Sequence, residues 1–295
     1  MKTAFFLLQS LRPRQWIKNV VVLAGLLFSL NAFNLELLVK SMAGVLLFCV
    51  LAGANYIFND LFDLKQDRLH PEKSRRPLAA GALAPKTALE VGIVMAAVSI
   101  LASYLLDAQF GLVASVYIVL MLLYSAALKN IVVLDVFIIS LGFVLRATAG
   151  AVIVKVEIST WLVVCTFLIS LLLALGKRRH ERMLLNDKGV MHRKTLAEYS
   201  PQLLDQMISV VSVCTVIAYS LYTVSESTYS KFGTRNLGYT IPLVIFGVFR
   251  YLYLVYKKEG GGNPEKLLLT DLPLVLTIGI WFLVSMLLIY GKSFF

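Results

Sequence analysis

Charged residues are scarce in this chain. Asp, Glu, Lys and Arg together make up only 15% of its 295 residues, whereas a soluble domain carries about 25%. Hydrophobic residues account for 59%, and the mean hydropathy is +0.80. This composition excludes an ordinary soluble enzyme. Apolar runs of about 17–25 residues, the length that a membrane helix needs, recur along the whole sequence.

Cysteines and the common catalytic motifs are also scarce or missing. The three cysteines, Cys49, Cys165 and Cys214, lie far apart inside apolar runs. Their spacing predicts neither a disulfide framework nor a zinc site. No GxGxxG, Walker A, HExxH or GxSxG pattern occurs, so a dinucleotide-binding fold, a zinc protease and a serine hydrolase have no local support.

The apolar runs predict an all-α polytopic membrane protein, with residues 1–295 forming a single integral membrane domain. In lipid every backbone polar group must be satisfied internally, which leaves helices or a closed barrel. The runs are too long and continuous for barrel strands. We expect about nine transmembrane helices, of which the first is the weakest because Asn19 and Asn31 flank it. They lie near 17–33, 39–58, 88–106, 110–128, 132–154, 160–177, 206–225, 237–256 and 271–290.

Positive charge predicts the orientation of these spans. The N-terminus and the even-numbered loops hold most of the Lys and Arg, and the opposite side holds only Lys40, Lys155, Lys231, Arg235 and Lys292. The positive-inside rule therefore places the N-terminus in the cytoplasm and the C-terminus outside, in the inner (plasma) membrane. The net charge of +11 is expected to attract anionic membrane lipids rather than nucleic acid.

Three cytoplasmic loops are expected to carry the chemistry, near 59–87, 177–205 and 257–270. The first two follow even-numbered helices and start about 118 residues apart, which hints at two related halves converging on one cavity. The third contains Gly260-Gly261-Gly262-Asn263-Pro264-Glu265, a turn-rich connector that can act as a flexible lid.

The most informative stretch runs from Asn59 to Pro77, in the first of these loops. Asn59, Asp63 and Asp67 follow an i, i+4, i+8 spacing, so on a helix they share one face. Oxygen ligands of this kind suit Mg²⁺, which binds through one or two carboxylates plus substrate phosphate oxygens. The sequence therefore predicts a metal site of Asn59, Asp63 and Asp67 that acts on a diphosphate at a bilayer surface.

Cationic residues follow these ligands directly. Lys73 and Arg76, which we count among the catalytic residues, and Arg68 and Arg75, which we count as substrate-binding, are expected to neutralise phosphates. His70 has two interpretations: it donates a hydrogen bond to phosphate, or it is structural, as befits a lone His before proline. Asp60 lies off the shared face and is expected to support the ligands.

A second set of candidates lies near the fourth and fifth expected spans: Tyr124, Lys129, Asp135 and Arg146. Asp135 and Arg146 are eleven residues apart, three helical turns, and so project on the same face. An ionised side chain at the centre of a membrane helix costs roughly 2.5–3.5 kcal/mol. The pair is either a structural ion pair or part of a cavity lined for an anionic substrate.

A third set follows the sixth expected span. Lys177 and Arg178 lie at the mouth of that span, and Glu181 lies one turn beyond Lys177, so that the two form a bridge or jointly face the substrate. The alternative is a cationic flank that only stops membrane transfer. Arg250 is a further charge in an apolar run, three residues before Tyr253, and can snorkel to the interface.

Several of these motifs resemble the UbiA superfamily of intramembrane prenyltransferases, and within it the decaprenyl-phosphate phosphoribosyltransferase branch. The resemblance spans most of the chain. It rests on Arg12-Pro13-Arg14-Gln15-Trp16-Ile17-Lys18-Asn19, on Asn59 to Lys73 with its Asp-Arg-x-His-Pro-x-Lys ending, on Arg76-Pro77-Leu78-Ala79-Ala80-Gly81, on Tyr124-Ser125-Ala126-Ala127-Leu128-Lys129, on Leu145-Arg146-Ala147-Thr148-Ala149-Gly150 and on Gly176-Lys177-Arg178-Arg179.

One departure from the family pattern matters. UbiA prenyltransferases carry a second Asp-x-x-x-Asp motif after the sixth helix, whereas this chain has Lys177-x-x-x-Glu181. A cationic group there suits a lipid phosphate better than a second metal. The departure favours the phosphoribosyl branch over prenylation of an aromatic ring.

The resemblance implies an all-helical protein with a central cavity and the use of Mg²⁺. It implies transfer of 5-phosphoribosyl from phosphoribosyl pyrophosphate to a polyprenyl phosphate, a step toward arabinofuranosyl donors for cell-envelope glycans. Lys18 joins the expected substrate-binding residues on this basis. The alternatives are a UbiA-type enzyme that uses a prenyl diphosphate and an aromatic acceptor, and a membrane transporter for an anionic solute. The sequence leaves the oligomeric state open, with a homo-oligomer as one alternative.

Overall fold

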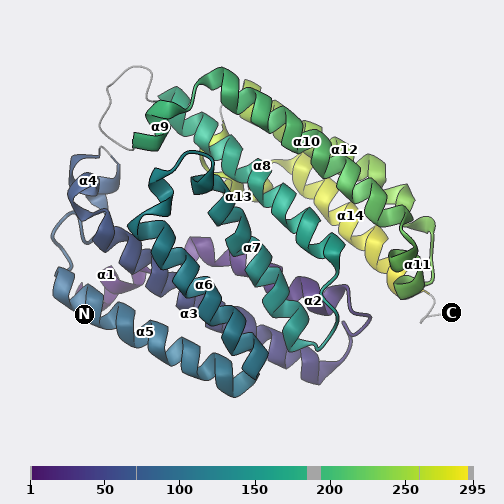
Figure 1. The fold of residues 1–295 in the computed structure, drawn as a ribbon, viewed down its shortest axis with the longest axis horizontal. Coiled ribbons are helices and arrows are strands. Elements are labelled where there is room, and N and C mark those ends of the chain that lie inside the picture. The colour runs from purple at the N-terminus through teal and green to yellow at the C-terminus, as the bar shows by residue number, and fades with distance from the viewer. Residues whose placement is uncertain (1, 71, 185–193, 259, 292–295) are drawn as a thin grey trace. The chain divides into compact units, whose positions relative to one another are not determined.

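The structure, a computed structural model, describes residues 2–70, 72–184, 194–258 and 260–291. Throughout these residues the regular elements are helices, with no strand (Figure 1). The chain divides into two compact units, one formed by Met1–Ile158 with Val190–Thr195 and the other by Ser159–Gly189 with Leu196–Phe295. The all-α prediction is confirmed.

The first unit contains the elements that carry the aspartate-rich stretch. They are α1 (Lys2–Ser10), η1 (Pro13–Leu23), α2 (Ala24–Leu27), α3 (Leu35–Phe62), α4 (Leu64–Leu69), η2 (Lys73–Arg75), α5 (Pro85–Leu106), α6 (Ala108–Ala126), η3 (Leu128–Asn130) and α7 (Leu134–Ile153). Helix α3 packs against α5, α6, α7 and η1. Phe48, Phe110 and Tyr117 are completely or almost completely buried at the centre of this packing.

The second unit is a bundle of four long helices. Its elements are α8 (Thr160–Leu184), α10 (Pro201–Val224), α11 (Glu226–Phe232), η4 (Asn236–Thr240), α12 (Ile241–Lys257), η5 (Gly260–Gly262), α13 (Pro264–Thr270) and α14 (Leu272–Tyr290), and α9 (Lys194–Glu198) crosses from the first unit into the second. Helix α10 packs on α8 and α12, and α12 packs on α14.

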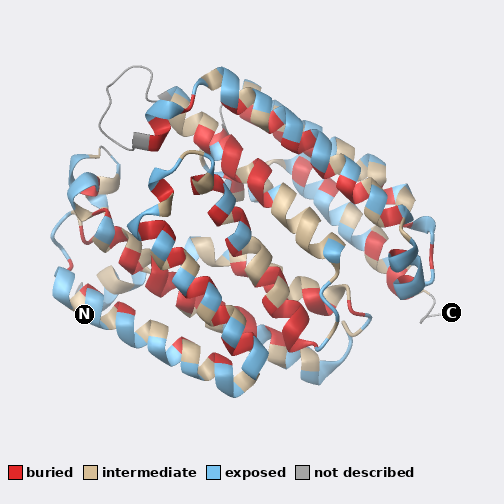
Figure 2. Ribbon diagram, in the orientation of Figure 1, coloured by how far each residue is buried: buried red, intermediate tan, exposed pale blue. Residues whose placement is uncertain are grey.

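Eight helices in the described part of the chain are long and apolar enough to cross a membrane. They coincide with eight of the nine expected spans and begin and end within a few residues of them, which identifies a multi-pass membrane protein. Helix α5 is the clearest lipid-facing span, because only 17% of its most apolar window is buried inside the protein and exposed positions recur along its length (Figure 2).

The span expected near 17–33 is not a long helix. The 3-10 segment η1 is followed by only four residues of α2. The cause is tertiary packing, which an apolar run cannot reveal. A Cβ added to Gly150 would overlap the carbonyl of Val22, and one added to Gly25 would overlap the backbone of Gly150. These two glycines let η1 and α2 lie backbone to backbone against α7.

Helix α3 delivers the aspartate-rich stretch to the end of the first unit. Asn34 caps its first turn by accepting a hydrogen bond from the Leu37 amide at 3.1 Å, which satisfies one of the free N–H groups at the helix start. The helix ends at Phe62, and α4 begins at Leu64, so that Asp63 alone separates them. The amides of Asp63 and Asp67 still bond the carbonyls four residues earlier, at 2.9 and 2.8 Å, so Asn59, Asp63 and Asp67 follow one bent helical path.

The loop expected near 257–270 is folded where it is described. Gly260–Gly262 forms η5, and Pro264–Thr270 forms α13. A Cβ on Gly261 would lie 2.6 Å from the Gly176 carbonyl oxygen, and one on Gly262 would overlap the His180 ring. The glycines therefore permit η5 to pack closely on α8, a role other than the flexible turn expected from composition.

Candidate functional site

Four polar side chains meet where α3 ends and α6 passes into η3; we call Asn59, Asp63, Ser125 and Lys129 the Asp63 cluster. The Lys129 ammonium forms an ion pair with Asp63 Oδ1. Asn59 donates to Asp63 Oδ2 at 3.2 Å and accepts from the Ser125 hydroxyl at 3.3 Å. Asp63 and Lys129 are both buried, so their attraction is weakly screened by solvent.

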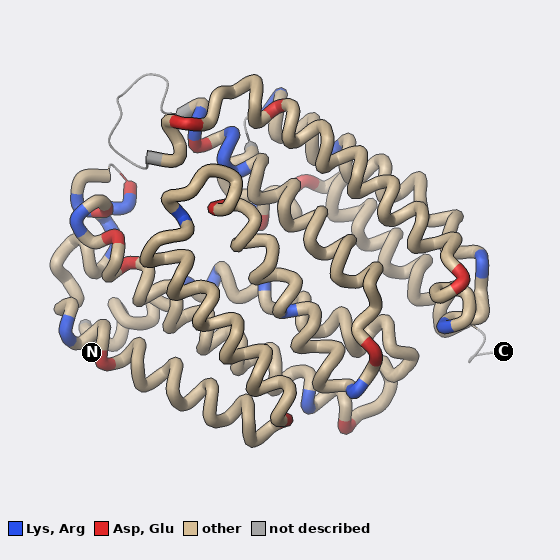
Figure 3. Tube along the Cα trace, viewed as in Figure 1, with Lys and Arg blue, Asp and Glu red and all other residues tan. Residues whose placement is uncertain are grey.

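A second group of charged residues surrounds Asp60; we call Arg12, Asp60, Asp67 and Arg76 the Asp60 cluster. Asp60 Oδ1 accepts hydrogen bonds from Arg12 and, at 3.0 Å, from Arg76. The same Arg76 nitrogen donates to Asp67 Oδ2 at 2.6 Å. Asp60 and Asp67 are each 2% exposed, and two guanidinium groups balance the two carboxylates. Acidic and basic residues mix along α4 and the loop after it (Figure 3).

The structure brings Asn59 and Asp63 together but directs Asp67 to Arg76. Among the described residues no three His, Cys, Asp or Glu side chains are close enough to hold a metal ion. Mg²⁺ does not need such a cage, since it binds through one or two carboxylates and completes its shell with water and substrate oxygens. The buried Asp63 carboxylate beside the Asn59 amide oxygen has that donor chemistry, and its pairing with the Lys129 ammonium marks it as a place for a cation.

Among the expected site residues that follow Asp67, His70 orders the backbone, whereas Arg68 and Arg75 are exposed cations. The Nδ1 atom of His70 accepts hydrogen bonds from the amides of Glu72 and Lys73, at 3.1 and 3.3 Å. This geometry favours the structural interpretation of His70, whose ring orders the turn before η2. Arg68 and Arg75 are exposed, and neither has a side-chain partner among the residues that the structure describes.

Arg146 lies deep in the first unit and binds uncharged partners. Its guanidinium donates from Nε to Asn19 at 2.7 Å, from one terminal nitrogen to the Gly142 carbonyl at 3.0 Å and from the other to the Tyr117 hydroxyl at 2.8 Å. Asp135 is not among its hydrogen-bond partners, which leaves the structural Asp135–Arg146 pair without support. Asp135 is fully buried at the start of α7.

Two further expected site residues belong to the first unit. Tyr124 is buried on α6, one residue before the Ser125 that contacts Asn59. Lys18 is half-buried on η1, next to the Asn19 that contacts Arg146. Tyr124 therefore lies next to a member of the Asp63 cluster, and Lys18 lies next to a partner of Arg146. Their roles toward substrate stay predictions.

The cationic set after the sixth expected span belongs to the second unit. Arg178 is buried and forms an ion pair with Glu181, while Lys177 is exposed. Glu181 is thus held by Arg178, three positions before it, whereas the sequence predicted a bridge to Lys177. Arg179 bonds Asp205 at 2.7 Å and stacks on Tyr256. Residues 185–193, part of the loop expected near 177–205, lie outside the described residues.

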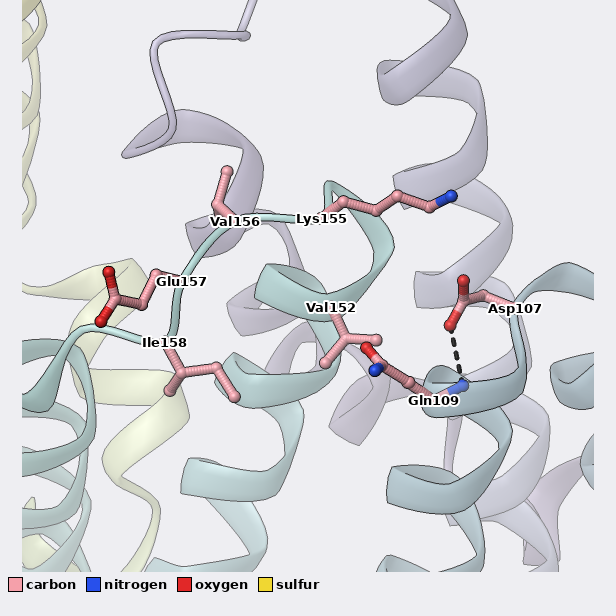
Figure 4. Close-up of a pocket in the computed structure, with 7 residues that line it drawn as sticks. All are labelled: Asp107, Gln109, Val152, Lys155, Val156, Glu157 and Ile158. Atoms are coloured by element: carbon pink, nitrogen blue, oxygen red, sulfur yellow. Dashed lines mark hydrogen bonds between the residues drawn. The ribbon is translucent and has the colours of Figure 1, made fainter.

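A cavity of about 540 Å³ lies in the first unit, at the opposite end of α6 from the Asp63 cluster. Figure 4 shows the residues that line it. The lining comes from the start of α6 with the residue before it, and from the end of α7 with the segment after it: Asp107, Gln109, Val152, Lys155, Val156, Glu157 and Ile158. Asp107 begins α6 and Lys129 follows its end, so the length of that 19-residue helix, about 28 Å, separates this cavity from the Asp63 cluster.

Four residues that make these contacts were not among the expected site residues: Arg12, Ser125, Asn19 and Tyr117. Arg12, Ser125 and Asn19 lie inside the motifs that carry the family resemblance, and that membership was the available signal. Tyr117 has no such signal, since a tyrosine in an apolar helix is normally a packing residue. Their contacts join residues 29 to 127 positions apart, which spacing rules for one helix cannot detect.

Comparison with known proteins identifies the family. Residues 19–272 match the UbiA prenyltransferase family. The chain belongs to this family. Two members resemble it over nearly their full length. It is 34% identical to decaprenyl-phosphate phosphoribosyltransferase of Corynebacterium glutamicum, over 98% of this chain and 88% of that protein. It is 32% identical to the protein of the same name from Mycolicibacterium smegmatis, over 93% of this chain and 89% of that protein.

A solved UbiA structure shows the same fold. The UbiA homologue of Archaeoglobus fulgidus bound to DMAPP and Mg²⁺ matches this chain with a TM-score of 0.72 and 21% identity, covering 96% of this chain and 98% of that one. At this level of identity the match establishes the UbiA fold alone. Membership of the family and the named relatives identify the protein as a transferase enzyme.

Proposed function

We propose that this UbiA-family enzyme transfers the 5-phosphoribosyl group of phosphoribosyl pyrophosphate to a polyprenyl phosphate, and that the transfer depends on Mg²⁺. The observation that carries the proposal is the nearly full-length similarity, at 32–34% identity, to two decaprenyl-phosphate phosphoribosyltransferases. The lack of a second aspartate pair, where this chain has Lys177 and Glu181, favours it over prenyl transfer to an aromatic acceptor.

The Asp63 cluster supports a site for the pyrophosphate end of the donor. Asn59 and Asp63 would hold the metal ion, with Asp67, which binds Arg76 in this structure, as the third expected ligand. The ion would neutralise negative charge on the leaving pyrophosphate. Lys129 already lies against Asp63, and Arg76 against Asp67. These two cations are therefore placed to bind phosphate oxygens next to the metal ligands, where charge develops during the reaction.

The reaction balances without a strong general base. An oxygen of the polyprenyl phosphate, already an anion, attacks the anomeric carbon of the donor and forms the new C–O bond. The bond from that carbon to pyrophosphate breaks, and pyrophosphate leaves with the electron pair. The products are polyprenyl-phosphoryl-5-phosphoribose and pyrophosphate. In-line attack would invert the anomeric centre.

Placement in the membrane follows from the same proposal. The prenyl chain would lie along apolar helices in lipid, with its phosphate at the cytoplasmic surface where α3 ends. Basic residues concentrate on the side of the N-terminus, which supports a cytoplasmic N-terminus in the plasma membrane. The product would then lead to arabinofuranosyl donors for envelope glycans.

A transfer assay tests the proposal. Purified protein in detergent is mixed with labelled phosphoribosyl pyrophosphate, a polyprenyl phosphate and Mg²⁺, with and without a chelator. We expect label to enter the organic phase, and the chelator to prevent this. The matched control is Asp107→Asn, because Asn keeps the cap of α6 and the position lies at the far end of that helix.

No labelled lipid from folded protein, across several prenyl chain lengths, would overturn the proposal. The same preparation would then be assayed with prenyl diphosphates and aromatic acceptors. Transfer that persists in the presence of chelator would overturn only the requirement for the metal.

A further inference from the structure

The smaller described cavity is a polar pocket next to the aspartate-rich stretch. It has a volume of about 260 Å³ and lies entirely within the first unit. Five of its eight lining residues are charged: Arg12, Asp60, Glu72, Arg75 and Arg76. The other three are Gln9, Ser10 and Pro77. Pro77 is the single apolar residue in this lining.

Two of the arginines are held in place by one carboxylate. Arg12 and Arg76 both donate to Asp60 Oδ1, each through a single terminal nitrogen. The same Arg76 nitrogen also donates to Asp67. The other guanidinium nitrogens of Arg12 and Arg76 have no protein partner among the described residues, and the two side chains are 27% and 24% exposed. Arginine presents five N–H donors in a rigid fork that matches phosphate oxygens. Donors fixed in this way can bind a phosphate at little further entropic cost.

The backbone at Arg12 is unusual in a way that supports a functional role. Arg12 has φ +52° and ψ +63°, in the left-handed region, which is strained for a residue other than glycine. Such conformations persist where the surroundings determine them and are common at ligand sites. Here the Arg12 guanidinium stacks on the Tyr56 ring, 4.9 Å from its centroid, in addition to its ion pair with Asp60.

The charges of the lining favour an anion. The lining holds three arginines and two carboxylates; Asp60 binds Arg12 and Arg76, and Asp67, outside the lining, also binds Arg76. Arg75 is exposed at the pocket and has no partner among the described residues. An incoming phosphate therefore meets one arginine without a counter-charge and two with unused donors.

We propose that this pocket binds the 5-phosphate of the phosphoribosyl donor, an inference that rests on the proposed function. Asp60 and Asp63 are three residues apart, and Arg76 joins Asp60 to Asp67, so the pocket adjoins the residues assigned to the pyrophosphate. A donor with an anionic group at each end fits two neighbouring cationic sites. A prenyl diphosphate carries no anionic group apart from the diphosphate itself, so it leaves Arg12 without a ligand, and the pocket would select phosphoribosyl donors.

Competition by two fragments of the donor tests this assignment. Ribose 5-phosphate carries only the proposed pocket ligand, and pyrophosphate carries only the leaving group. In Arg12→Gln we expect the inhibition constant of ribose 5-phosphate to rise about tenfold or more, as expected for loss of a charged hydrogen-bond donor. The inhibition constant of pyrophosphate should change less than twofold. The KM for the donor should rise, and the KM for polyprenyl phosphate should not.

Three further variants keep the test decisive. Arg75→Gln changes an exposed side chain that has no partner among the described residues, so it should disturb folding little. It should also raise the inhibition constant of ribose 5-phosphate. Arg12→Lys keeps the charge without the planar fork and should restore part of the affinity. Arg14→Gln is the matched control, because Arg14 is exposed two residues away and does not line the pocket; it should behave as wild type.

An equal rise in the inhibition constants of ribose 5-phosphate and pyrophosphate in Arg12→Gln would overturn the assignment. So would a rise confined to the KM for polyprenyl phosphate, which would assign the pocket to the lipid phosphate. Direct binding of labelled ribose 5-phosphate to the solubilised protein needs no turnover. If wild type binds it and Arg12→Gln does not, but no phosphoribosyl transfer occurs, the phosphate site stands and the proposed reaction fails. If wild type does not bind it, the pocket assignment fails.

Discussion

The Nε atom of Arg146 donates to the side-chain oxygen of Asn19 at 2.7 Å, across 127 residues of sequence. Asn19 in turn donates from its amide nitrogen to the Cys49 sulfur at 3.3 Å. The pair therefore ties η1 to α7 and to α3 at one buried point. The Arg146 charge is compensated by hydrogen bonds and by the faces of Tyr117 and Phe143, 4.8 and 5.1 Å away.

Removing the Asn19 side chain should destabilise the first unit. Asn19→Ala leaves the buried Arg146 without one of its acceptors, and a hydrogen bond to a charged group contributes about 1.5–3 kcal/mol. We expect the free energy of unfolding in detergent to fall by about that amount, with the KM values changing little. Asn236→Ala is the control, because Asn236 is exposed and its side chain has no partner among the described residues. A variant as stable as wild type would show that this hydrogen bond is dispensable.

Asp63→Asn and Asp67→Asn should each abolish turnover without unfolding the protein. The substitutions keep size and shape but remove the charge that faces Lys129 or Arg76. Losing one preorganised group that stabilises developing charge typically lowers kcat by roughly 10²–10³-fold. Initial rates under saturating substrates, with circular dichroism to check folding, measure the effect. Near-normal turnover in either variant, with Mg²⁺ present, would remove that residue from the metal ligands.

Gly150→Ala should disrupt the contact between α7 and η1. The added Cβ would overlap the Val22 carbonyl, which is backbone and cannot rotate away. Overpacking of this kind costs about 1–3 kcal/mol, and thermal unfolding in detergent would measure it. The control is Gly279→Ala in α14, where nothing lies within 4 Å of the added atom. That substitution should be neutral or slightly stabilising, because alanine favours a helix more than glycine does. Equal stability of the two variants would contradict the close contact.

Arg250 and Asp271 should make the second unit sensitive to acid. Arg250 binds Asp271 through two hydrogen bonds, at 3.0 and 2.8 Å, and these lower the pKa of Asp271, at the start of α14, below its usual value. A carboxyl with a lowered pKa in the folded state stabilises fully above its unfolded pKa, about 3.9. This stabilisation is lost as the pH falls through the lowered pKa.

The melting temperature of wild type should therefore exceed that of Asp271→Asn near neutral pH, and the difference should shrink in acid. Asn retains the cap of α14, so the comparison isolates the charge. Glu226→Gln, which removes an exposed ion pair with Arg235, should change the melting temperature little at neutral pH. A difference between wild type and Asp271→Asn that grows in acid would contradict the assigned pKa shift.

The long helices could be predicted because lipid imposes one rule on every residue that faces it. The expected span near 110–128 lies almost on α6, and the one near 132–154 almost on α7. The run near 17–33 obeys the same hydropathy rule but folds as η1 and α2. Its conformation depends on a glycine contact with residue 150, which no local pattern contains.

The sequence predicted which residues belong to the candidate site better than it predicted the contacts between them. Helical spacing brought Asn59 and Asp63 to one place, as the structure has them. The same spacing did not indicate that Asp67 binds Arg76, or that Asp60 holds two arginines. Those pairings depend on how the chain turns after His70, where two amides bond the imidazole. Periodicity ends where the helix ends, and side-chain contacts decide the rest.

The long separations between partners have a consequence for synthesis in the cell. Arg12 reaches the membrane 48 residues before Asp60, Asp63 precedes Lys129 by 66 residues, and Asn19 precedes Arg146 by 127. Contacts between distant residues form late, because the loops between them must close first. The polar groups of the early spans must therefore stay hydrogen-bonded to water until their protein partners have been synthesised. The site in the first unit is complete only after α7 has been made.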